Sequence, residues 1–180
     1  MAKFYNKITP RIQKFIEAQK IFFVATAPVE GRINLSPKGM DSLRVIEENR
    51  IIWLNVTGSG NETAAHVHQN ERITIMMCAF EGAPNILRIY GKAREIKPND
   101  KNWEELASLL PEIPGARQIF DVTVESAQTS CGMSIPFYEY KGEREDLNEW
   151  ALKKEKNGIK QYWKDKNQTS IDGLETNIKN

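Results

Sequence analysis

The stretch "RITIMMCAFEGAPNILRIYGKAREI", residues 72–96, decides the fold. Its two halves, "RITIMMCAF" and "ILRIYGKAREI", are rich in β-branched and aromatic residues, a composition typical of strands. Between them lies a turn of glycine, alanine, proline and asparagine at positions 82–85. A short turn joins antiparallel neighbours, whereas parallel strands need a longer crossover. The stretch therefore predicts an antiparallel hairpin whose second strand is long.

Further strands are expected on both sides of this hairpin. "IFFVATA" from Ile21 predicts a buried strand. "RINLSPKG", residues 32–39, predicts a half-buried partner, because Ile33 and Leu35 alternate with polar residues. Three more strands are expected in "LRVI", in "RIIWLNV" and from Ile119 to Val124.

The expected elements favour a mainly β fold with flanking helices. Helices are predicted from Thr9, up to about Asn70, in "NDKNWEELASLLPEI" and in the charged tail from about Gly142. Six or more strands with mostly short connections predict an antiparallel barrel instead of alternating βαβ units. We expect one domain over residues 1–141 and a charged helical tail over 142–180, whose last dozen residues are candidates for disorder.

The composition narrows the classes of protein. With 180 residues, of which 40% are hydrophobic, the chain can bury one sizeable core. Its formal net charge of +1 gives no basic excess for a nucleic-acid or membrane-surface partner. The first residues lack the apolar core of a signal peptide, and no apolar run is long enough to span a bilayer. Cys78 and Cys131 form no CxxC pair, so we expect a cytoplasmic protein without a zinc site or a disulfide framework.

The loop in "WLNVTGSGNETAAHV", residues 53–67, separates a strand end from a helix start. Its two glycines permit backbone angles that side chains forbid, and its hydroxyl groups lie beside the free N–H groups of the helix start. Such a place suits a phosphate. A second interpretation needs no ligand, because Ser59 and Glu62 have the S-x-x-E spacing of a capping box. The loop alone leaves both interpretations open.

Neither of two familiar nucleotide-phosphate motifs fits this loop. No lysine follows its second glycine as in a P-loop, and Thr63 stands where a dinucleotide fingerprint has its third glycine. A phosphate here would need a nearby cation, because Glu62 adds a negative charge. Lys38 is the first candidate and Arg44 and Arg50 follow, although each is also explained as an exposed surface charge.

Four segments in succession carry a family resemblance: "GRINLSPKGMDSLRV", "WLNVTGSGNETAAHV", "NERITIMMCAFEGAPNILRIYGKAREI" and "QTSCGMSIP". In this order they resemble the FMN-binding split-barrel proteins related to pyridoxamine 5'-phosphate oxidase. The resemblance covers about Phe22 to Pro136, most of the chain. It implies an antiparallel split β-barrel and a homodimer with two FMN molecules at the subunit interface.

The resemblance also implies which residues would contact FMN. Those in and after the expected strands are Asn34, Leu35, Ser36, Lys38, Asn55, Thr57, Ser59, Gly60, Asn61, Glu62 and Thr63. The loop among them would hold the ribityl phosphate. Ser130, Cys131 and Gly132 would approach the flavin, and that flavin could belong to the other subunit. A packed Cys131 is favoured over a redox nucleophile, because nothing in the sequence supplies a base.

Two departures from the family pattern bear on the substrate. Pyridoxamine 5'-phosphate oxidases resemble one another in an Arg-Lys pair after the phosphate-loop serine, where this chain has Gly60 and Asn61. They also carry an Arg-x-His element near the C-terminus, whereas the histidines here are His66 and His68. Vitamin B6 oxidation is therefore not predicted.

The expected function is flavin-mediated hydride or electron transfer on an unidentified small molecule. One alternative is a flavin- or haem-binding module without turnover, and another is a deazaflavin-dependent reductase. Haem would require an axial ligand such as His66 or His68. The two histidines lie two positions apart on the expected helix and point to nearly opposite sides, so a shared metal is not predicted and a packing or surface role is favoured.

Overall fold

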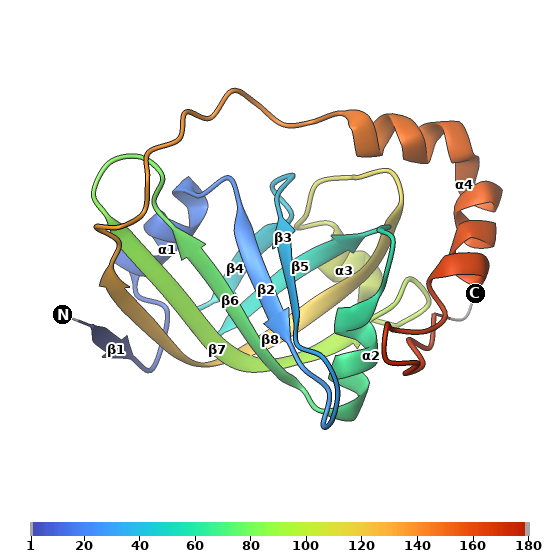
Figure 1. Ribbon diagram of the computed structural model, residues 1–180, viewed down its shortest axis with the longest axis horizontal. Coiled ribbons are helices and arrows are strands. Elements are labelled where there is room, and N and C mark those ends of the chain that lie inside the picture. The colour runs from blue at the N-terminus through green and yellow to red at the C-terminus, as the bar shows by residue number, and fades with distance from the viewer. Residues whose placement is uncertain (1, 179–180) are drawn as a thin grey trace.

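The computed structural model describes residues 2–178 as one curled antiparallel sheet with helices around it (Figure 1). The strands are β1 (Lys3–Tyr5), β2 (Phe22–Thr26), β3 (Asn34–Lys38), β4 (Leu43–Glu47), β5 (Arg50–Val56), β6 (Arg72–Cys78), β7 (Asn85–Ile96) and β8 (Ala116–Cys131). The helices are α1 (Pro10–Ala18), α2 (Glu62–Gln69), α3 (Trp103–Ala107) and α4 (Asp146–Lys166). The predicted mainly β fold with flanking helices is confirmed.

The sheet has the strand order β3-β2-β6-β7-β8-β5-β4, and β1 pairs with β8. The predicted hairpin of β6 and β7 is at its centre. β7 pairs with β8 from Asn85 opposite Cys131 to Ile96 opposite Ile119, and the other edge of β8 pairs with β5 and β1. β8 is much longer than the predicted strand at 119–124, because these neighbours supply backbone partners along both of its edges.

A bulge in β8 lies opposite a glycine in the middle of β7, with Glu125 as the extra residue between Val124 and Ser126. The register between β7 and β8 shifts between Tyr90 and Gly91. A Cβ atom at Gly91 would lie 2.2 Å from the carbonyl oxygen of Thr123, far inside van der Waals contact. The bulge bends β8, and the missing side chain at Gly91 lets the two strands stay close.

The barrel interior is packed by apolar side chains from both halves of the sheet. Trp53 and Phe120 are fully buried and stack with their ring centroids 4.8 Å apart. Ile12 and Ile16 of α1 belong to the same cluster. A second cluster lies on the other face of β5, where Ile52 packs with residues of α3 and its flanking loops. Burial on both faces explains the continuous apolar run "RIIWLNV".

β3 is half-buried and pairs with β2 as predicted, but its apolar residues lie on the exposed face. Ile33 and Leu35 are 76% and 63% exposed, while the polar Asn34, Ser36 and Lys38 alternate with them on the less exposed face. β3 is an edge strand whose pairing partner within residues 2–178 is β2. Its inner face borders a polar pocket instead of the apolar core, so the usual assignment of apolar residues to the inside does not hold here.

After β8 the chain crosses the top of the barrel and reaches α4 at the opposite side (Figure 1). Within α4, Glu155 has a left-handed φ of 56°, which breaks the helix into two pieces. The segment after α4 turns back beside α2, and a β-bridge joins Thr169 to Glu175. The last dozen residues, for which disorder was expected, include residues 179 and 180, which lie outside the described residues. No helix within residues 2–178 is long and apolar enough to cross a membrane.

Candidate functional site

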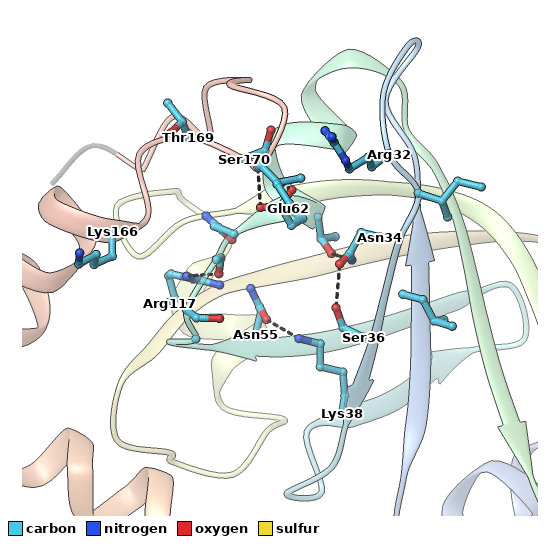
Figure 2. Close-up of a pocket in the computed structure, with 18 residues that line it drawn as sticks. Arg32, Asn34, Ser36, Lys38, Asn55, Glu62, Arg117, Lys166, Thr169 and Ser170 are labelled. Carbon is cyan, nitrogen blue, oxygen red and sulfur yellow. Dashed lines mark hydrogen bonds between the residues drawn. The ribbon is translucent and has the colours of Figure 1, made fainter.

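A pocket of about 670 Å³ lies between β3, the loop from β5 to α2, and the segment after α4 (Figure 2). It gathers most of the predicted site residues: Asn34, Leu35, Ser36, Lys38, Asn55, Ser59, Gly60, Asn61, Glu62 and Thr63. It also contains residues that the sequence did not indicate: Arg32, Arg117, Lys166, Thr169, Ser170 and Ile171. The strand and the loop predicted to act together therefore form one site.

The wall formed by β3 is polar and tied to the start of α2. Ser36 Oγ donates to Asn34 Oδ1 at 3.0 Å, and Asn34 Nδ2 lies 3.5 Å from Thr63 Oγ1. Alternation along the strand turns Asn34, Ser36 and Lys38 to the same face. Leu35 borders the pocket at its rim, with most of its side chain exposed.

Lys38 places a largely buried ammonium group in this wall. Its Nζ lies 3.5 Å from Asn55 Oδ1 and 5.2 Å from the ring centroid of Trp53 (Figure 2). Within residues 2–178 it makes no ion pair with a carboxylate. Burial and then the nearby charge of Arg117 lower the pKa of Lys38 to about 8. The two other predicted cations lie elsewhere, since Arg44 pairs with Asp41 and Arg50 pairs with Asp121.

Arg117 is a second buried cation, and sequence reasoning missed it. Its side chain is 4% exposed, and Nη1 donates to Gly60 O at 3.1 Å and to Asn167 Oδ1 at 2.8 Å. Its Nε has no hydrogen-bond partner in the part of the chain that the structure describes. Burial lowers the pKa of Arg117 to about 10. Extending the alternation seen from Ile119 backwards by two residues would have placed Arg117 at a strand position.

The loop before α2 presents free backbone N–H groups, and the capping-box interpretation is wrong. The helix begins at Glu62 with Asn61 as its N-cap, and the Glu62 carboxylate accepts from Ile171 N at 3.1 Å instead of turning back to Ser59. Asn61 Oδ1 accepts from Gln118 Nε2 at 2.6 Å. The backbone N–H groups of residues 59–63 make no hydrogen bond within the described residues. They are therefore available to an anion.

The segment after α4 closes one side of the pocket. Asn167 is fully buried, and its Nδ2 donates to Gly58 O at 3.1 Å and to Ser59 O at 3.3 Å. Arg32 near the start of β3 forms an ion pair with Asp172. These contacts join positions more than a hundred residues apart, which no local sequence pattern reveals.

Thr57 lies beneath the loop instead of lining the pocket. Its Oγ1 donates to Gly115 O at 2.8 Å and accepts from Trp163 Nε1 at 2.8 Å. The side chain thus connects the end of β5, the start of β8 and α4. Its position indicates that it holds the loop in place.

Ser130, Cys131 and Gly132 lie at the other end of β8. Ser130 and Cys131 border a separate pocket of about 560 Å³ together with residues of α1 and the β6–β7 turn. Ser130 Oγ accepts from Arg88 Nη1 at 3.2 Å, and the Cys131 side chain is exposed. The structure does not bring these three residues to the pocket of Lys38 within one chain.

The two histidines occupy different environments on α2. His66 is buried, and its Nδ1 lies 3.1 Å from Thr26 Oγ1. His68 Nε2 lies 2.8 Å from Glu95 Oε2. Among residues 2–178, no group of three or more His, Cys, Asp or Glu side chains could hold a metal ion.

Known proteins resemble this chain over its sheet. The family model for pyridoxamine 5'-phosphate oxidase matches residues 8–131. A pyridoxamine 5'-phosphate oxidase family protein of Aspergillus flavus, ustO, is 32% identical over 144 residues, which cover 77% of this chain and 58% of that protein. The chain thus spans somewhat over half the length of this relative.

Two solved structures share the fold. A variant of HupZ from Group A Streptococcus aligns with a TM-score of 0.56 at 21% identity, over 68% of this chain and 99% of that one. A candidate pyridoxamine 5'-phosphate oxidase from Lactobacillus delbrueckii aligns with a TM-score of 0.53 at 20% identity, over 68% and 94%. At these identities the likeness concerns the fold alone. The family match ends before α4 and the segment that follows it.

Proposed function

Because the chain belongs to the pyridoxamine 5'-phosphate oxidase family, we propose that it binds FMN and oxidises or reduces a small molecule with it. The observation that carries the proposal is the buried Lys38 ammonium, which lies near Arg117 without a carboxylate partner within residues 2–178. Two buried cations repel each other, and each has lost its hydration. A bound anion would offset both costs, and the FMN phosphate is an anion of this kind.

The loop offers the groups that a phosphate needs. Free N–H groups of residues 59–63 and the hydroxyls of Ser59 and Thr63 surround the start of α2, where the helix dipole favours negative charge. Lys38 adds a charge-assisted hydrogen bond from β3. These groups would hold the phosphate, while the amide of Asn34 and the hydroxyl of Ser36 lie along the strand for polar atoms of the flavin.

The contribution of the protein to the reaction is binding and orientation. When bound, FMN supplies a ring that accepts and returns hydride or electrons. Lys38 and the loop fix the phosphate end, and β3 orients what extends from it. The segment after α4 keeps water from one side of the pocket.

The proposal includes a homodimer in which Ser130, Cys131 and Gly132 of one subunit approach the FMN of the other. Arg117 and Ser130 lie thirteen positions apart on β8, at most about 43 Å along the strand at 3.3 Å per residue, and they border two separate pockets. One chain therefore cannot offer both to one ligand. The exposed Ile33 and Leu35 beside the pocket support burial against a second copy. Sedimentation velocity should give twice the mass of one chain.

The haem alternative has less support. His66 is buried against Thr26, and His68 lies against Glu95, so neither imidazole faces the pocket of Lys38. Either histidine would need a rearranged α2 to serve as an axial ligand in this pocket. Flavin binding requires no such change.

The proposal is tested by titrating the purified protein with FMN and with riboflavin, after an absorbance spectrum and identification of any released chromophore. Lys38→Met should weaken FMN binding by about 1.5–3 kcal/mol, the range of a hydrogen bond to a charged group. Riboflavin lacks the phosphate and should be affected little. Arg44→Met removes a cation that pairs with Asp41 outside the pocket, and it should change neither affinity. Equal losses of FMN and riboflavin, or no FMN binding at all, would contradict the proposal.

A further inference from the structure

Two buried side chains hold three consecutive carbonyl groups of the loop before α2: Asn167, which lies beyond the family match, holds two, and Arg117 of β8 holds the third. Asn167 Nδ2 donates to the carbonyls of Gly58 and Ser59, and Arg117 Nη1 donates to that of Gly60. Arg117 also donates to Asn167 Oδ1, which fixes the orientation of the amide. The buried pair of Asn167 and Arg117 therefore fixes the orientation of three successive peptide groups.

Because a peptide group is planar, the hydrogen bonds that fix these carbonyls also fix the directions of the N–H groups that follow them. In a planar trans peptide the C=O of one residue and the N–H of the next point in opposite directions. Holding the carbonyls of residues 58–60 towards Asn167 and Arg117 therefore turns the N–H groups of residues 59–61 away from them. Those N–H groups make no other hydrogen bond within residues 2–178. They remain free for a ligand in the pocket that the same loop lines.

We propose that Asn167 is a positioning residue for the phosphate site: it orients the loop so that the N–H groups of residues 59–61 bind the phosphate. This inference rests on the proposed function. It makes phosphate recognition depend on a segment outside the region that matches the family. Asn167 itself touches carbonyls and Arg117, and it acts on the ligand through the loop.

Further contacts fix the position of Asn167. Its backbone N–H donates to Trp163 O at 3.0 Å, and its backbone carbonyl accepts from Thr176 Oγ1 at 2.5 Å. Glu62 accepts from the N–H of Ile171, and Asp172 pairs with Arg32. The docked segment therefore contacts the loop, the helix start and the β3 side of the same pocket. Binding of a phosphate and docking of this segment must then favour each other by the same factor.

The first test compares Asn167→Ala with Asn157→Ala, an exposed asparagine on α4. Asn167→Ala should weaken FMN by about tenfold or more, as expected for lost charge-assisted hydrogen bonds, and riboflavin by less than about twofold. The ratio of the two affinities separates a positioning role from general destabilisation, which would weaken both ligands alike. An unchanged ratio in a folded Asn167→Ala protein would overturn the inference, and Asn157→Ala should match the unmodified chain.

The second test needs no variant. Hydrogen exchange of the unmodified protein should slow in residues 163–178 when FMN is added, and riboflavin should produce a much smaller change. FMN that binds but leaves exchange in this segment unaltered would overturn the inference while the proposed function stands. If FMN does not bind, the proposed function fails. The orienting role of Asn167 is then tested without a ligand. Asn167→Ala should speed hydrogen exchange of residues 58–63, and exchange rates equal to those of the unmodified protein would overturn the inference.

Discussion

The two ends of β8 show how one strand serves two unlike sites. Near its start, Arg117 and Asp121 are each 4% exposed, and both hold fixed partners. At its end, Ser130 is only partly buried and Cys131 is exposed at the rim of a different pocket. The first end has buried charges held by surrounding chain, whereas the second is open. A site predicted from both ends is therefore complete only if a second subunit brings the open end to the pocket of Lys38.

The largest effect on stability is expected from Asp121→Asn, near the start of β8, which we call the closed end because its charges are buried. Asp121 accepts from Arg50 Nε at 2.9 Å and from Arg94 Nη2 at 2.7 Å. Removing the charge should lower the free energy of unfolding by about 2–3 kcal/mol, less than for a fully buried pair because the Arg94 side chain is 60% exposed. Urea denaturation measures this. Glu125→Gln, farther along β8 with an exposed carboxylate, should change stability by less than about 0.5 kcal/mol.

The same substitution has a pH signature. Burial acts to raise the pKa of Asp121, but hydrogen bonds and the charges of Arg50 and Arg94 outweigh burial and lower it below its usual value of 3.8. A carboxyl with a lowered folded-state pKa stabilises above its unfolded-state pKa and loses this effect as pH falls through the lowered value. The stability difference between Asp121→Asn and the unmodified protein should therefore shrink below about pH 4. A difference that is constant down to acid pH would refute the assignment.

A smaller effect is expected from Lys38, next to the closed end. Its pKa of about 8 lies below the 10.5 of an exposed lysine, so the unfolded chain binds more protons between these values. Converted in full, this shift corresponds to roughly 3 kcal/mol. Because Lys38 keeps some exposure to solvent, ligand-free stability should rise by about 1–2 kcal/mol over this interval, while FMN affinity falls as the ammonium is lost. Lys38→Met should remove most of both trends. Chemical denaturation and FMN titrations at several pH values measure them, and parallel trends of stability and affinity would contradict this interpretation.

The smallest effect is expected at the open end, from Ser130→Ala. The 3.2 Å hydrogen bond from Arg88 is partly buried, so its loss should change the free energy of unfolding by less than about 1 kcal/mol. Thermal denaturation measures this. A loss as large as that of Asp121→Asn would mean that the two ends are equally constrained and would remove the contrast between them.

Local patterns predicted the strands well and the faces less well. The hairpin of β6 and β7 follows from two apolar segments around a turn, and this prediction is confirmed. The alternation in "RINLSPKG" predicted a half-buried strand but not that its polar face is the covered one, because an apolar–polar alternation identifies two faces without saying which one meets a pocket. The three-residue β1 was missed, since so short a segment carries too little periodicity.

The candidate site was predicted where neighbouring residues form it. The predicted residues between Asn34 and Lys38 and between Asn55 and Thr63 belong to two short segments, and the structure brings all of them except Thr57 to one pocket. Arg117 and Asn167 were missed, because they reach the loop through contacts that span 57 to 109 residues. Such contacts depend on the tertiary fold and leave no periodic signal in the sequence.

The long connection from β8 to the segment that carries Asn167 also sets an order of events during synthesis. A nascent chain that has emerged through Cys131 already holds every strand of the sheet, but Asn167 is still to be added. Domains fold as units while translation proceeds at about 5–20 residues per second. The barrel can thus close seconds before the loop of residues 58–60 receives its last constraint. If this loop binds a phosphate as proposed above, uptake of that ligand is a late event in maturation, separated in time from formation of the sheet.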